Sequence, residues 1–105
     1  MNLEERILAT LYAPMIFPQF QKELEKNGIQ PYGDRAFVIE PKTIIWHGMS
    51  PQVAKGIQTL FVDEKITIEL TPLIFYAAEG KILPYPLAGQ VGCTTTWLPC
   101  LLRKT

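Results

Sequence analysis

Nucleophilic or metal chemistry would have to come from three soft side chains: His47 is the sole histidine, and Cys93 and Cys100 are the two cysteines. A histidine beside a thiol acts as its general base, so folding that brings His47 against either cysteine would make a Cys/His-dependent enzyme. A zinc knuckle spaces its cysteines by about two to four residues, whereas these two lie seven positions apart. We therefore expect no metal, no cofactor and reduced structural cysteines. A Cys/His-dependent enzyme is the third hypothesis for the function, after the two given at the end of this section.

Glycine-rich phosphate loops are a second source of chemistry. The seven glycines form neither Gly-x-Gly-x-x-Gly nor Gly-x-x-x-x-Gly-Lys, the patterns that place backbone N–H groups around a phosphate. The nearest approach, residues 89–92, is not followed by a helical pattern. The sequence therefore does not support a nucleotide site of either kind.

Ten basic and ten acidic residues give a net charge of zero, without the positive excess typical of proteins that bind nucleic acids or anionic membranes. One pattern keeps nucleic acid as an alternative partner. Residues 50–60, joined by a short link to residues 66–68, resemble the helix and following strand of winged helix-turn-helix domains. That resemblance implies a wing over residues 73–87. The nucleic-acid contacts that it implies are Gln52, Lys55, Gln58 and Lys81.

Helical periodicity and start signals predict three helices. Asn2 caps the first, whose apolar positions continue to Leu11. Pro18 suits the first turn of the second, and Gly28 ends it in a left-handed conformation. Ser50, as a cap followed by proline, starts a third helix that runs to residue 61. Four polar positions of the second helix are expected to face water: Gln21, Lys22, Glu23 and Glu25.

Strands are predicted over most of the remaining chain. Residues 35–40 and 42–46 are expected to form a hairpin or one bent strand around a proline. Residues 66–70 form a half-buried strand, and residues 73–77 a strand buried on both faces. Prolines confine residues 82–87 to an edge strand or an extended segment. The last β-like segment, residues 91–102, surrounds Trp97.

These elements predict an α+β fold rather than the strict βαβ alternation of a parallel sheet. We expect a single domain over residues 1–105, with two amino-terminal helices, one further helix at about residues 50–61, and an antiparallel sheet of roughly four to six short strands. A winged-helix-like arrangement is compatible with this order.

A sorting or membrane-spanning segment is not expected. The first charged residues are acidic, unlike the basic start of a signal peptide. The longest apolar run, residues 73–78, has six residues, against the roughly 20 that a membrane helix needs. We therefore expect a cytoplasmic protein without a membrane partner.

Apolar residues make up 48% of the chain and charged residues 19%. A chain of 105 residues leaves part of its apolar surface exposed, and such surface can bind another protein. The residues proposed for this surface are Tyr76, Tyr85, Trp97 and Leu101. The leading hypothesis is a small interaction or regulatory module that self-associates, as a homodimer, or binds another protein. The alternative is a winged-helix-like nucleic-acid-binding regulator.

Overall fold

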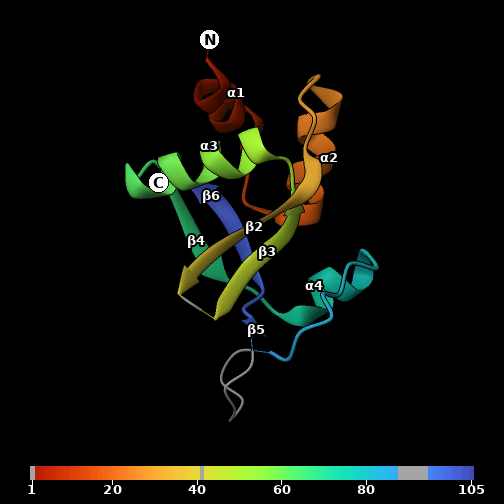
Figure 1. Cartoon of the computed structure of the whole chain (residues 1–105). Helices are drawn as coiled ribbons and strands as arrows, with labels where there is room; N and C mark the ends of the chain where they lie inside the picture. Colours follow the sequence, from red (N-terminus) through yellow and green to blue (C-terminus); the bar gives the residue numbers. More distant parts are fainter. Residues whose placement is uncertain (1, 41, 88–94) are drawn as a thin grey trace.

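A computed structural model of the chain describes residues 2–40, 42–87 and 95–105. Helices and strands alternate irregularly within these residues, which confirms the α+β class (Figure 1). The four helices are α1 (Leu3–Thr10), α2 (Phe17–Lys26), α3 (Pro51–Val62) and α4 (Leu73–Ala78). The six strands of the described residues are β1 (Met15–Ile16), β2 (Tyr32–Glu40), β3 (Thr43–Met49), β4 (Ile66–Leu70), β5 (Thr96–Trp97) and β6 (Cys100–Lys104).

The described strands form two sheets, with the orders β1-β6-β4 and β2-β3-β5. The prediction of one antiparallel sheet is therefore wrong in two respects, since β3 and β5 also pair in parallel. The chain changes sheets between Trp97 and Cys100. Leu98 donates its N–H to Ile44 of β3, and the carbonyl of Pro99 accepts from Thr71 just beyond β4. Because this proline carries no N–H, the ladder ends here and the chain turns into the second sheet.

The helix starts lie where the local signals predict them. The Oδ1 atom of Asn2 accepts the N–H of Glu5 at 2.8 Å, and the Ser50 hydroxyl accepts the N–H of Val53 at 3.4 Å. The Ser50 hydroxyl also donates to the carbonyl of Gln30 at 2.8 Å. This residue therefore caps α3 and fixes the helix to the segment before β2.

Helices α1 and α3 cross in close contact at Gly56, which is buried in the middle of α3. A Cβ atom at this position would lie 2.6 Å from Cδ1 of Ile7 on α1. The absence of a side chain thus lets the two helices approach each other, which offsets the roughly 1 kcal/mol that glycine costs inside a helix.

Residues 73–78 form a short helix rather than the predicted buried strand. Pro72 precedes it in an extended conformation, and only Tyr76 of its six residues is buried. A continuous apolar run of this length is compatible with either element by pattern alone. Because the segment is helical, the predicted two-stranded wing over residues 73–87 is wrong.

Four aromatic rings form the centre of the core. The ring of Trp46 lies 6.1 Å from Phe17, 5.4 Å from Tyr76 and 6.3 Å from Trp97, measured between centroids. Tyr76 and Trp97 meet edge to face at 5.2 Å, a favoured aromatic geometry. These rings come from α2, β3, α4 and β5. The buried cluster that contains them also includes Ile66 and Leu102 of the β1-β6-β4 sheet, so the core joins both sheets. Among the described residues, no helix has the length and apolar character needed to cross a bilayer.

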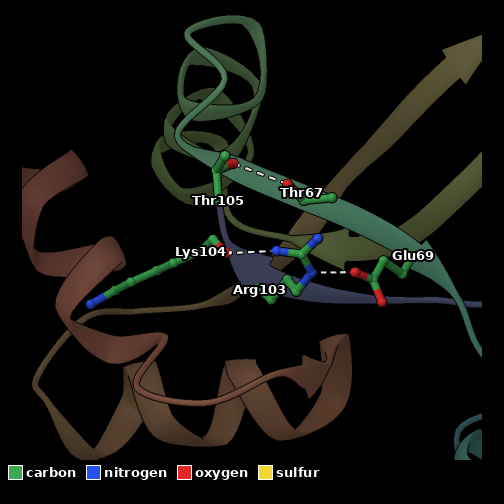
Figure 2. A network of polar contacts seen from close by, with 5 residues as sticks. All are labelled: Thr67, Glu69, Arg103, Lys104 and Thr105. Carbon is green, nitrogen blue, oxygen red and sulfur yellow. Dashed lines mark hydrogen bonds and ion pairs between the residues drawn. The ribbon is translucent and has the colours of Figure 1, made fainter.

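The sheet β1-β6-β4 carries a polar network at the carboxyl end of the chain (Figure 2). The guanidinium of Arg103 on β6 binds the carboxylate of Glu69 on β4, and its other arm donates to the carbonyl of Lys104 at 3.1 Å. The hydroxyls of Thr67 and Thr105 lie 3.0 Å apart. These exposed contacts hold β4 in register with β6, and exposed ion pairs of this kind contribute little to stability.

Candidate functional site

Cys100, a predicted nucleophile candidate, is 2% exposed and carries a free thiol. Burial raises the pKa of this thiol from 9.0 to about 11. Because the thiolate is the reactive form, a thiol with a raised pKa is a poor nucleophile at neutral pH. The structure therefore places Cys100 in the core as a small apolar side chain. Cys93 lies outside the described residues.

Cys100 is expected to resist modification in the folded protein. In a Cys93→Ser variant, Ellman's reagent at neutral pH should detect no thiol until guanidinium is added, and then one equivalent. The raised folded pKa also favours the protonated thiol, so its contribution to stability is complete below pH 9.0 and is lost as the pH rises through about 11. Rapid modification of the folded variant would contradict this assignment.

His47 lies on β3 with its side chain exposed. It lines a hollow of about 330 Å³ together with Lys81, Lys22 and Tyr32. Cys100 does not line that hollow, so the structure does not bring the two predicted Cys/His partners together there. Lys22 forms an ion pair with Glu79 at 2.9 Å. Across the described ranges, no three His, Cys, Asp or Glu side chains cluster as a metal would need.

The residues predicted for nucleic-acid contact are exposed but lie at separate places. Lys55 and Gln58 line a groove between α3 and β2 together with Arg35. Gln52 is exposed on α3 without lining that groove, and Lys81 lines the hollow beside His47. The arrangement is therefore not the continuous helix-and-wing surface that the resemblance implied.

Two of the four residues predicted for an interaction surface are core residues. Tyr76 and Trp97 have no exposed area, because both rings pack into the aromatic centre. The hydroxyl of Tyr76 donates to the carbonyl of Cys100 and accepts the N–H of Phe17 at 3.4 Å. Burial strongly raises the pKa of this phenol. Tyr85 and Leu101 are half-buried, and Tyr85 packs against the core.

Gln21 was predicted to face water, but its side chain is buried at the junction of α2 and the β2–β3 hairpin. Its amide donates to the carbonyls of Pro31 at 3.1 Å and Gly48 at 3.0 Å. Its Oε1 atom accepts the indole N–H of Trp46 at 3.1 Å. Both amide hydrogens and the amide oxygen of Gln21 thereby have a partner inside the protein, so this residue is a structural anchor.

The candidate site combines two exposed apolar side chains of α4 with two half-buried apolar side chains of β1 and β6 beside it. Ile74 is 68% exposed and Phe75 is 54% exposed, on a helix that carries no charged residue. Phe75 borders a hollow of about 360 Å³ that also includes Ile16 and Leu101. We call these four residues the α4 patch. Figure 1 shows α4 at the end of the molecule away from α1 and α3.

Leu101 is the member of the α4 patch that was predicted from the sequence. Ile74 and Phe75 were counted among the large apolar residues of the carboxyl half but were not assigned to the surface, because residues 73–77 were predicted to be a strand buried on both faces. Pro72 before the run and two alanines at its end favour a helix. When Tyr76 points from this helix into the core, the side chains at positions 74 and 75 point away from the core.

Comparison of the chain with protein-family models, with curated proteins and with solved structures gave no match.

Proposed function

We propose that this protein is a small cytoplasmic interaction module that forms a homodimer through the α4 patch. One observation carries the proposal: an uncharged helix presents isoleucine and phenylalanine beside an apolar hollow.

The α4 patch suits a second copy of the same chain. A two-fold dimer uses one surface twice, so that surface must fit itself. The patch offers a projecting ring, Phe75, and a hollow bordered by the same ring and Leu101. The net charge of zero also gives no long-range repulsion between two copies.

The gain from burying the patch and the cost of association are of similar size, so the proposed dimer is expected to be weak. Burying an exposed Ile or Phe side chain contributes roughly 1.5–3 kcal/mol, and symmetry applies each contribution twice. Association also costs about 4–15 kcal/mol in lost translational and rotational freedom and side-chain ordering. Glu79 lines the hollow and forms an ion pair with Lys22, so its carboxylate would form part of a polar rim.

Phe75→Glu is expected to dissociate the dimer. Two phenylalanines lose their burial, and two carboxylates come together in the interface. The loss of about 3–6 kcal/mol corresponds to a roughly hundredfold or larger rise in the dissociation constant. Sedimentation equilibrium across a concentration series measures this change.

Val62→Glu is the matched control. Val62 is 70% exposed on α3, outside the α4 patch, and gains the same charge. The dissociation constant of its dimer should equal that of the unmodified protein, and thermal melts should show that both variants are folded. If both substitutions dissociate the dimer equally, or if neither dissociates it, the result would contradict a role for the α4 patch.

A further inference from the structure

The groove between β2 and α3 combines a free strand edge with one face of a helix. Four consecutive residues of β2, positions 35–38, form one wall. The other wall consists of Pro51, Ala54, Lys55 and Gln58, whose spacing places them on one face of α3. The volume of the groove is about 330 Å³. It is separate from the α4 patch, since the two share no residue.

β2 lies at the edge of its sheet and lines this groove. Within the described residues, β2 is an edge strand hydrogen-bonded to β3 alone. An edge strand presents unpaired N–H and C=O groups, which an extended peptide can use to add a strand. Register shifts occur at Arg35 and between Phe37 and Val38. A further shift lies between Val38 and Glu40. Bulges twist an edge strand and limit pairing along it, so only a short peptide strand can be added here.

The walls of the groove are small or apolar where a peptide backbone would approach. Ala36 and Ala54 face it from opposite sides, and Val38 is exposed beside them. Phe37 is buried and packs edge to face against Phe61, with the centroids 5.5 Å apart. This ring contact joins β2 to α3 beside the groove.

The charges in the groove are positive. Arg35 and Lys55 line it from the two walls, and no carboxylate lines it. The nearest acidic partner of Arg35 is its neighbour Asp34, at 3.7 Å between Nε and Oδ1, with an almost fully exposed carboxylate. An exposed pair of this kind is weak. No ion pair of Lys55 appears among the described residues.

We propose that this groove binds an extended acidic peptide as an added strand on β2. Main-chain hydrogen bonds to residues 35–38 would hold the peptide, and Arg35 and Lys55 would bind its carboxylates. The backbone supplies affinity for any extended segment, while the two cations select acidic side chains.

The test uses three fluorescein-labelled hexapeptides and fluorescence anisotropy. The first alternates glutamate with valine and threonine, the second has lysine in place of glutamate, and the third carries a central proline that removes a backbone N–H. We expect the first to bind in the millimolar range or tighter, more weakly with added salt, and the other two to bind at least roughly tenfold more weakly. Hydrogen exchange at the amides of residues 35–38 should slow when the first peptide is bound.

Charge reversal identifies the groove. Arg35→Glu and Lys55→Glu should each weaken binding of the acidic peptide at least roughly tenfold. Lys65→Glu, at an exposed lysine outside the groove, makes the same change in net charge and should bind like the unmodified protein. Phe75→Glu should also bind normally, so failure of the dimer proposal leaves this one intact.

Several results would overturn the proposal. The lysine or proline peptide could bind as tightly as the acidic peptide, or the acidic peptide could fail to bind at millimolar concentration. Lys65→Glu could weaken binding of the acidic peptide as much as Arg35→Glu and Lys55→Glu do. Hydrogen exchange at the amides of residues 35–38 could also stay unchanged when the peptide is added. Binding of a labelled oligonucleotide that is lost in Arg35→Glu and Lys55→Glu, without peptide binding, would assign the groove to nucleic acid instead.

Discussion

Replacing Trp97 with alanine is expected to lower the free energy of unfolding by about 3–5 kcal/mol. The side chain has no exposed area and contacts the rings of Trp46 and Tyr76, at 6.3 and 5.2 Å between centroids. Alanine would leave a cavity where both sheets meet, and the surrounding rings can only partly fill it. For a domain of this size, the loss is a large fraction of total stability.

Chemical denaturation monitored by circular dichroism measures this effect. Leu70→Ala is the control, because Leu70 is 70% exposed on β4. It should change the free energy of unfolding by no more than about 0.5 kcal/mol. A similarly small change for Trp97→Ala would indicate that Trp97 is exposed, as the sequence pattern predicted. It would contradict the position of β5.

Gln21→Leu is expected to lower the free energy of unfolding by about 2–4 kcal/mol. Leucine has a similar size but cannot bind the indole N–H of Trp46 or the carbonyl of Gly48. The Trp46 donor is buried and would be left without a partner. The carbonyl of Pro31 loses less, because it also accepts the N–H of Ser50 at 3.0 Å. The loss therefore arises mainly from one orphaned donor and one orphaned acceptor.

Gln19→Leu on the same helix is the matched substitution, since Gln19 is exposed. Its free energy of unfolding should stay within about 0.5 kcal/mol of the unmodified protein. Indistinguishable denaturation midpoints for Gln21→Leu and Gln19→Leu would show that Gln21 faces water, as its sequence pattern suggested.

The parts of the fold that could be predicted depend on neighbouring residues. Asn2 and Ser50 cap helices through N–H groups three positions along the chain, and Pro18 and Pro51 fit the first helical turn. The alternation in residues 66–70 also identified β4. In each case the deciding contact is local, so the sequence pattern contains it.

The errors in sheet pairing and in the burial of Gln21 concern contacts between distant parts of the chain. The parallel pairing of β3 with β5 joins Ile44 to Trp97, which no local pattern encodes. Gln21 has the composition of a surface residue, yet its partners are residues 31, 46 and 48. Its burial depends on the hairpin that packs against α2, so helical periodicity alone could not predict it.

The candidate site was predicted only in part, because a short apolar run is compatible with a strand or a helix and residues 73–77 were predicted to be a strand. An apolar surface in the carboxyl half was expected, and Leu101 lies in it. Tyr76 and Trp97 instead turn inward because residues 73–78 are helical and β5 crosses to the first hairpin. Helical geometry then leaves Ile74 and Phe75 exposed, and these carry the proposed interface.

Sedimentation equilibrium of the unmodified protein at micromolar concentration tests the dimer most directly. The mass of one chain is 11.9 kDa. We expect a monomer–dimer equilibrium whose limiting mass is twice that value. A mass of 11.9 kDa at every concentration up to the millimolar range would contradict self-association and leave the α4 patch for a different protein.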